Sequence, residues 1–294
     1  MYKLPVWQTI KDGLGFIWTE KRAWFDYALI PIIVATAAPM LLGLLLVGTP
    51  IIGLASEAEI NSLFQDLDFM FFAAIALGVL VSVWLYVAFA VAWHRRYLLG
   101  PQNTSARELI QWSRRHWIFV GRGVGYFVLL AAAMIPLVFV LNLILASLII
   151  ALGPAGPVLV PVIVFALFLF VVVQIVGLSL AFPAAAIEDS ELGLIAAWKL
   201  ARGNRWRMCG IIVFGTIVPT FIIQLILLAI VSAILIAVGL TADTSVTPSI
   251  AALVIIELVS QAISFLGIAI GVSMLSIMYR RLRDNLPLDA KETA

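Results

Sequence analysis

The stretch that decides the fold lies at residues 157–187, which read PVLVPVIVFALFLFVVVQIVGLSLAFPAAAI. It contains no charged side chain over its whole length. A helix needs roughly 20 apolar residues to cross the hydrocarbon core of a bilayer, and the strands of a membrane barrel alternate in polarity over about 10 residues. This stretch is longer than a barrel strand and does not alternate, so it predicts a transmembrane helix.

Five further stretches have the same continuous apolar character, at residues 25–48, 69–93, 118–151, 208–239 and 249–279. Hydrophobic residues make up 64% of the chain and charged residues 12%, whereas soluble domains contain roughly 45–50% apolar and about 25% charged residues. A water-soluble chain of this size could not bury so much apolar surface in one core. The sequence therefore predicts an all-α polytopic membrane protein, with six transmembrane helices in a single membrane domain over residues 1–294.

The basic residues predict which way the chain crosses the membrane. All 18 lysines and arginines fall in four alternate segments, namely the N-terminal segment, the loops after the second and fourth predicted spans, and the C-terminal tail. The three opposite loops contain no basic residue but contain Glu57, Glu59, Asp66, Asp68 and Asp243. Because loops rich in lysine and arginine stay in the cytoplasm, we expect an integral protein of the bacterial inner (plasma) membrane with both termini cytoplasmic.

Three similar segments indicate an internal repeat. Each begins with a short amphipathic stretch, continues with a basic residue and a tryptophan, and then contains two apolar spans, the first of which carries a proline. The units are residues 5–95, 104–187 and 189–280, with the markers Arg22-Ala23-Trp24, Arg115-His116-Trp117, Arg205-Trp206, Pro39, Pro136 and Pro219. Parallel repeats of two spans each share one orientation in the membrane. The alternative is that any six-span protein carries tryptophan and arginine at its inner boundaries.

The third unit contains the most distinctive text, Leu180-Ala181-Phe182-Pro183-Ala184-Ala185-Ala186-Ile187-Glu188-Asp189 and then Ala197-Trp198-Lys199-Leu200-Ala201-Arg202-Gly203-Asn204-Arg205-Trp206. A proline near the end of a span, an acidic pair, a helix with tryptophan, and Arg-Gly-Asn before an aromatic residue resemble the membrane domain of glycerophosphoryl diester phosphodiesterases and related bacterial multi-pass proteins. The resemblance implies a six-helix membrane domain over most of the chain. In the phosphodiesterases a soluble catalytic barrel follows that domain. Here the predicted sixth span ends at residue 279 of 294, so the resemblance carries over no catalytic residue.

The sequence contains few residues that could perform catalysis. His94 and His116 have no cysteine or carboxylate clustered with them in the sequence, and two histidines alone rarely form a metal site. The glycine-rich residues 121–125 open a membrane helix without a preceding strand, so they do not fit a dinucleotide-binding loop. Cys209 lies just inside an apolar run and is typical of a small core residue. We expect no catalytic, cofactor-binding or metal-binding residue, no enzymatic activity, no cofactor and no nucleic-acid partner.

A basic and aromatic face is the first candidate site. Tryptophans and basic residues lie together near the predicted cytoplasmic boundary, at Arg114, Arg115, Trp117, Arg202, Arg205 and Trp206. Because cations near a membrane attract anionic headgroups, we expect these six residues to contact lipid headgroups. The partners would be membrane lipids, anionic ones among them, or an unknown membrane protein. The alternative is an ordinary aromatic belt with positive-inside charge.

Apolar residues also recur at helical spacing near the N-terminus, at Trp7, Ile10, Leu14 and Ile17. They predict an amphipathic helix. Its lysines lie away from that apolar stripe or at its edge, as in helices that lie flat in the membrane interface.

Polar residues within the spans are the second candidate site, at Glu257, Gln261, Gln174 and Gln224. An ionisable residue at membrane depth usually faces the bundle interior or a water-filled cavity, so Glu257 and Gln261 would mark the path of a small transporter or channel. The structural alternative is interhelical hydrogen bonding, often worth ~1 kcal/mol or less per bond. We expect a non-enzymatic membrane protein that engages lipid or a protein partner through its cytoplasmic face, with the transporter as the alternative.

Overall fold

The structure, a computed structural model, describes residues 2–46, 69–152, 156–237 and 250–285. The acidic residues predicted to lie across the membrane from the basic segments, Glu57, Glu59, Asp66, Asp68 and Asp243, fall outside the described residues. Every regular element within the described ranges is a helix, which confirms the all-α prediction.

Within the described residues, six helices are long and apolar enough to cross a membrane, which agrees with the predicted number of spans. The first three are α2 (Lys21–Leu46), α4 (Phe69–Leu99) and α5 (Arg114–Leu152). The fourth combines α6 (Gly156–Ile175), the 3-10 helix η4 (Val176–Leu180) and α7 (Ala181–Ala186). The fifth combines α9 (Arg205–Ile212), the π-helical turn η5 (Val213–Ile217) and α10 (Val218–Ala237), and the sixth is α11 (Ile250–Asp284). The chain is thus an all-α polytopic membrane protein.

The long helices continue past the apolar stretches at the end where the basic residues lie. The helix α4 runs on from residue 93 to Leu99, and α11 runs on from residue 279 to Asp284. The helix α5 begins at Arg114, before the apolar stretch that starts at residue 118. Because arginine and leucine are good helix formers, helical structure persists after the hydrophobicity has ended.

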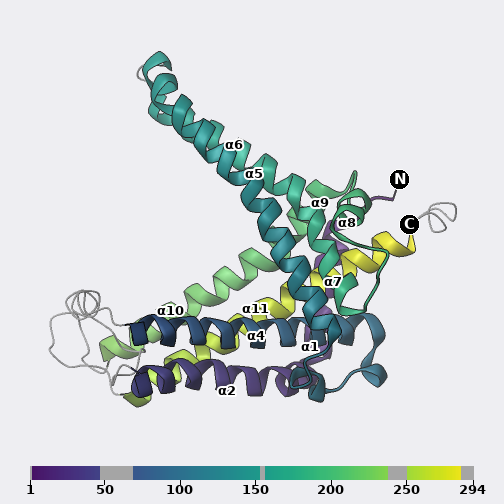
Figure 1. The fold of residues 1–294 in the computed structure, drawn as a ribbon, viewed down its shortest axis with the longest axis vertical. Coiled ribbons are helices and arrows are strands. Elements are labelled where there is room, and N and C mark those ends of the chain that lie inside the picture. The colour runs from purple at the N-terminus through teal and green to yellow at the C-terminus, as the bar shows by residue number, and fades with distance from the viewer. Residues whose placement is uncertain (1, 47–68, 153–155, 238–249, 286–294) are drawn as a thin grey trace.

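Four short elements gather at one end of the long helices, α1 (Val6–Thr19), η1 (Pro101–Asn103), η2 (Ala106–Leu109) and α8 (Leu194–Leu200). The starts of α2, α5 and α9 and the ends of α4, α7 and α11 lie at the same end (Figure 1). The lysines and arginines of the described chain fall in these segments or in the short stretches next to them. We therefore call this end of the molecule the basic end.

The helices α2, α4 and α11 pack against one another as the main bundle, and α10 lies against α11. The hairpin of α5 and α6 leaves the bundle at the basic end and points away from it, as its teal ribbon shows in Figure 1. It meets the other helices there, where α5 packs on α7 and α4 and α6 meets α9. Large apolar side chains of α5, α6 and α10 are consequently exposed, which suits helices whose surroundings are lipid tails as apolar as leucine.

Aromatic side chains build the core of the main bundle. Trp93 of α4 is fully buried, and its indole N–H donates to Oγ of Ser273 on α11 over 3.0 Å. Phe89, one turn earlier, stacks on Trp93 with ring centroids 6.0 Å apart, and Phe265 of α11 meets Phe89 edge-on at 5.2 Å. A buried indole N–H needs a hydrogen-bond partner, and Ser273 supplies one without placing a charge inside the bundle.

Two glycines let α11 approach its partner on the fifth span closely. A Cβ atom at Gly267 would lie 2.9 Å from Cγ2 of Thr220, and one at Gly271 would lie 3.2 Å from Cγ2 of Thr216. The spacing of Gly267 and Gly271 is that of the G-x-x-x-G motif, which puts both glycines on one face of a membrane helix. At this face the threonine side chains of the fifth span therefore pack directly on the backbone of α11.

The predicted repeat units match unevenly. Each unit contains its pair of spans, and the first and third begin with a helix, α1 and α8 respectively. The second unit begins with the 3-10 turns η1 and η2, where an amphipathic helix was predicted. Pro101 has no N–H to donate and the residues around it are polar turn formers, so this segment favours turns over a regular helix.

One structural parallel favours the repeat. The pair Glu108-Leu109 in the second unit resembles Glu191-Leu192 in the third. Both leucines are buried, and both glutamates pair with an arginine at the end of a span, Arg95 on α4 and Arg283 on α11. The threefold repeat itself stays a prediction.

Candidate functional site at the basic end

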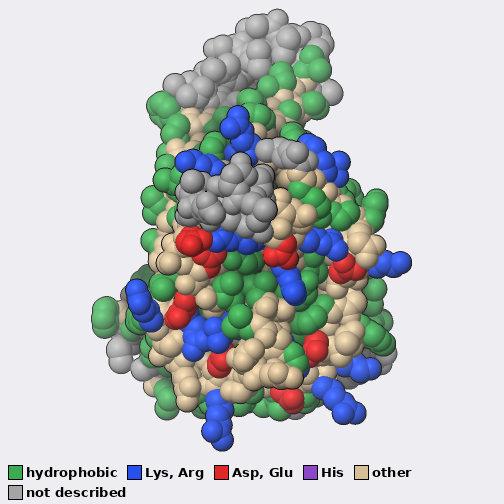
Figure 2. Space-filling view, turned by 90° about the vertical axis from the view of Figure 1, so that its right-hand side faces the viewer, with side chains coloured by type: hydrophobic (Ala, Val, Ile, Leu, Met, Phe, Trp, Pro, Cys, Tyr) green, Lys and Arg blue, Asp and Glu red, His purple; other side chains and the backbone are tan. Residues whose placement is uncertain are grey.

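Acidic and basic side chains alternate across the basic end, with hydrophobic side chains between them (Figure 2). Four arginines at the ends of α4 and α11 form ion pairs with residues of other segments there, as Arg95–Glu108, Arg96–Glu20, Arg281–Asp12 and Arg283–Glu191. The pairs join the ends of long helices to α1, to η2 and to the segment before α8. Their arginines are already neutralised by the fold, so they are poorly suited to bind an external anion.

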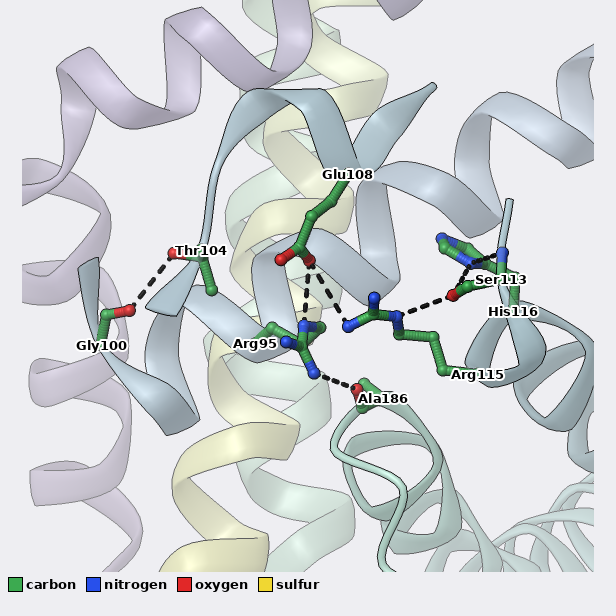
Figure 3. Close-up of polar contacts among 8 residues, drawn as sticks. All are labelled: Arg95, Gly100, Thr104, Glu108, Ser113, Arg115, His116 and Ala186. Atoms are coloured by element: carbon green, nitrogen blue, oxygen red, sulfur yellow. Dashed lines mark hydrogen bonds and ion pairs between the residues drawn. The ribbon is translucent and has the colours of Figure 1, made fainter. Parts of the chain in front are cut away.

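Arg115, one of the predicted lipid contacts, belongs to an internal cluster around Glu108 (Figure 3). The Glu108 carboxylate accepts a hydrogen bond from Nε of Arg95 over 2.9 Å and lies 4.0 Å from Nη1 of Arg115. Nε of Arg115 donates to Oγ of Ser113 over 2.8 Å, and Nη1 of Arg95 donates to the carbonyl of Ala186 over 3.3 Å. Arg115 therefore ties η2 to the start of α5.

Arg205 and Gln174, placed by the sequence in two different candidate sites, meet at the basic end. Nη1 of Arg205 donates to Oε1 of Gln174, and its guanidinium lies 3.8 Å from the centroid of the Trp198 ring. The Trp198 indole N–H donates to the carbonyl of Gln174 over 2.9 Å. The helix α6 ends at Ile175, so Gln174 lies at the end of α6 and not beside Glu257. These contacts lock α8 and α9 to the fourth span.

The other four predicted headgroup contacts are exposed. Trp117 and Trp206 are 66% and 60% exposed, and the side chains of Arg114 and Arg202 are exposed as well. The side chain of neither arginine forms a hydrogen bond or ion pair with any part of the chain that the structure describes. These six predicted headgroup contacts, which we call the collar, thus include two internally bonded arginines and two unpaired ones, and each unpaired arginine is near an exposed tryptophan in the sequence.

The helix α1 adds a second exposed aromatic face to this end. Trp7 and Trp18 are 73% and 75% exposed, and Leu14 and Lys11 are exposed between them. Ile10 points the other way and is buried in the core. The predicted amphipathic helix is confirmed, but its apolar residues do not form the single stripe that was predicted. They split into an inner edge packed on α11 and an outer edge that faces the surroundings.

Asn204, from the motif that carries the family resemblance, holds the N-terminal segment. Its side chain is buried, Nδ2 donates to the carbonyl of Tyr2 and Oδ1 accepts the backbone N–H of Leu4, both over 2.9 Å. Gly203 before it has a φ of 80°, a conformation that glycine adopts without steric cost. Gly203 therefore makes the turn, and Asn204 holds the N-terminal segment against it as a clamp.

The predicted intramembrane site is reduced to a short chain of hydrogen bonds. Nε2 of Gln261 donates to Oε1 of Glu257 over 2.7 Å, and the hydroxyl of Tyr86 on α4 donates to Oε1 of Gln261 over 3.2 Å. Gln224 is exposed on α10. The four polar residues that the sequence grouped together therefore lie in three separate surroundings, and only Glu257 and Gln261 contact each other.

The histidines are packing residues. His94 is fully buried with Nδ1 2.7 Å from Oγ of Ser276, and His116 accepts the backbone N–H of Ser113 over 3.0 Å while stacking on Trp112. Among the residues that the structure describes, no group of three or more histidine, cysteine or acidic side chains could hold a metal ion. The polar side chains at the basic end that could contact a ligand are therefore arginines, carboxylates and hydroxyl groups.

Sequence reasoning missed a cleft of about 380 Å³ at the basic end. It opens between the α1–α2 junction, the end of α4 and the segment from η1 to η2. Its charged lining residues are Glu20, Lys21, Arg22, Asp26 and Arg96. The sequence could signal only the charged residues at the start of α2, because the other walls come from segments far along the chain.

Comparison with known proteins adds no relative to this picture. No protein-family model, no curated protein and no solved structure matches the chain. The resemblance to the membrane domain of the phosphodiesterases therefore stays a prediction, carried by residues 180–206. What the structure adds is that part of this text, Gly203-Asn204, clamps the N-terminal segment.

Proposed function

We propose that this integral membrane protein is non-enzymatic and binds anionic lipid headgroups at its basic end, with both termini on the cytoplasmic side of a bacterial inner membrane. The observation that carries the proposal is the unpaired state of Arg114 and Arg202, which are exposed in the sequence neighbourhood of the exposed Trp117 and Trp206. At the same end of the molecule, four arginines are ion-paired with residues of other segments. Exposed cations that no described acidic side chain neutralises favour an external anion as the partner.

The physical basis is a combination of aromatic anchoring and charge. Tryptophan is enriched where a membrane meets water, because its ring is apolar and its N–H is polar. Each lysine or arginine near an anionic leaflet contributes ~1 kcal/mol of attraction. The outer edge of α1, with Trp7, Lys11 and Trp18, would lie at the same level and extend the binding surface.

The transporter alternative has less support. A transport path would need polar side chains gathered along the spans, whereas Gln174 bonds to Arg205 at the basic end and Gln224 is exposed. Glu257 has a hydrogen-bond partner in Gln261, and the cleft described above is lined by other residues. We therefore assign Glu257 and Gln261 a structural role.

The test compares two matched double variants. Arg114→Gln with Arg202→Gln removes two unpaired cations, and Arg115→Gln with Arg205→Gln removes two internally bonded ones. Native mass spectrometry would count phosphatidylglycerol and cardiolipin retained by each protein, and thermal unfolding would report stability. Losing two cations at ~1 kcal/mol each corresponds to up to about 30-fold weaker retention.

We expect the first variant to lose anionic lipid at unchanged stability, and the second to lose stability through its broken internal hydrogen bonds. The loss in the first variant should shrink at high salt, because salt screens exposed charges. Equal lipid retention by the first variant and the unmodified protein would contradict the proposed function. So would an equal loss from both variants without any change in stability.

A further inference from the structure

The cleft at the α1–α2 junction holds charges of both signs that the fold leaves unused. Glu20 and Arg96 in its wall form an ion pair of 2.6 Å. Lys21, Arg22 and Asp26 are exposed and form no ion pair with any described residue. The cleft therefore offers two unpaired cations and one unpaired carboxylate within a volume of about 380 Å³.

The missing contact between Arg22 and Asp26 is informative. Residues four apart on a helix are neighbours, and an arginine and an aspartate there commonly attract one another. The structure shows no ion pair between them, although both line the same cleft. Lys21 is instead held over the Trp18 ring, 4.8 Å from its centroid. The side chains thus keep a positive and a negative position apart.

Hydroxyl groups complete the polar lining. Ser105, between η1 and η2, is exposed in the cleft wall, and Thr104 beside it uses its hydroxyl to bond the carbonyl of Gly100 over 3.2 Å. The Ser105 hydroxyl can therefore donate to a ligand oxygen. A dianion would be repelled by Asp26, and a simple cation would be repelled by Lys21 and Arg22. A ligand that carries a phosphate and an ammonium satisfies both positions.

An apolar stripe leads away from the cleft along α2. Phe25, Leu29 and Ile33 are 55%, 40% and 50% exposed, and they follow one another at intervals of four residues. Side chains at that spacing lie on one face of a helix. The stripe starts beside Asp26 and runs toward the middle of the span, where hydrocarbon chains would lie.

We infer that the cleft binds a single zwitterionic phospholipid of the phosphatidylethanolamine class. Its phosphate lies against Lys21, Arg22 and Ser105, its ammonium lies against Asp26, and its acyl chains follow the stripe on α2. A pocket of this size is at the small end of the range of roughly 300–1,000 Å³ that small-molecule sites occupy, which suits a headgroup and not a whole lipid. The inference uses none of the collar arginines, so it can fail while the proposed function stands.

The experiment measures lipid preference in the full-length protein. The protein is equilibrated in vesicles of equal phosphatidylethanolamine and phosphatidylglycerol and released for native mass spectrometry, and the ratio of the two lipids retained is counted. Asp26→Asn should lower the preference for phosphatidylethanolamine about fivefold, the effect of one exposed charge pair. Asp26→Lys should turn the preference toward phosphatidylglycerol, and Arg22→Gln should reduce retention of both lipids. Glu188→Gln is the matched control, because Glu188 is an exposed carboxylate outside the cleft.

Each outcome decides the matter. A preference that is unchanged in both Asp26 variants would overturn the inference. Full displacement of the retained lipid by soluble glycerophosphoethanolamine would also overturn it, because the stripe on α2 would then contribute nothing. If Asp26→Asn changes the lipid ratio while the Arg114 and Arg202 double variant does not, the cleft stands and the proposed function falls. The reverse pattern removes the cleft alone.

Discussion

The clamp formed by Asn204 gives the sharpest test of how the basic end is held together. Its amide bonds Tyr2 and Leu4, residues that lie about 200 positions earlier in the chain. Leu4 is fully buried, so its backbone N–H has no access to water if the asparagine is removed. Replacing Asn204 with alanine therefore breaks two hydrogen bonds and leaves a buried donor without a partner.

The expected loss of stability follows from these contacts. A hydrogen bond contributes about 1 kcal/mol net, and a buried group left unsatisfied costs a further ~1–3 kcal/mol. Asn204→Ala should therefore lower the free energy of unfolding by about 3–5 kcal/mol. Asn204→Asp keeps the acceptor for Leu4 but replaces the donor to Tyr2 with a second oxygen. It should fall between the unmodified protein and the alanine variant.

Tryptophan fluorescence during thermal unfolding in detergent would measure this loss, and limited proteolysis would report release of the first residues. A change of this size corresponds to a shift of several degrees in the midpoint. Arg202→Gln, two residues away and exposed, is the matched control and should melt with the unmodified protein. The reasoning is refuted if Asn204→Ala also melts with it, or if the N-terminal segment stays protected in that variant.

Three further predictions address other parts of the molecule. A reporter fused after Ala294 should give a cytoplasmic signal and one inserted near Glu59 an external signal, and a cytoplasmic signal at Glu59 would contradict the proposed topology. Gly267→Val should destabilise the protein by ~1–3 kcal/mol in thermal unfolding, because its Cβ would lie 2.9 Å from a neighbouring methyl group; Gly121→Val, with open space around it, should cost less. Glu257→Gln should leave stability unchanged, because the amide can still accept the hydrogen bond from Gln261; a pH-dependent flux in proteoliposomes that only this variant loses would argue for the transporter.

The spans could be predicted from sequence because their cause is local. A run of apolar residues long enough to cross the hydrocarbon core is stable only within the membrane. Such a run can be recognised in the sequence without knowing which helices pack against it. The exact ends of the helices were harder to predict from the sequence. Helix α4 continues to Leu99 because helix formation does not stop at the edge of the lipid. The second unit lacks its predicted helix because Pro101 disfavours one there.

The candidate sites were harder to predict because they depend on contacts between distant segments. Nothing near Arg115 in the sequence distinguishes it from Arg114, yet only Arg115 reaches Glu108. Gln174 looked like a deep polar residue when depth was counted along the chain, but Arg205 meets it at the basic end. The walls of the cleft come from three segments that are distant in the sequence, so no local sequence pattern could predict it.

Basic residues have two separate effects, on the orientation of the chain in the membrane and on lipid binding, and a count of basic residues does not distinguish them. Orientation during insertion depends on the excess of lysine and arginine, and acidic residues contribute little to it. Lipid binding by the folded protein depends on the cations that remain unpaired. Arg96 and Arg281 count fully toward the first effect, yet Glu20 and Asp12 neutralise them in the fold. The proposed lipid binding therefore depends on exposed cations that the described chain leaves unpaired, such as Arg114 and Arg202, and not on the total number of basic residues.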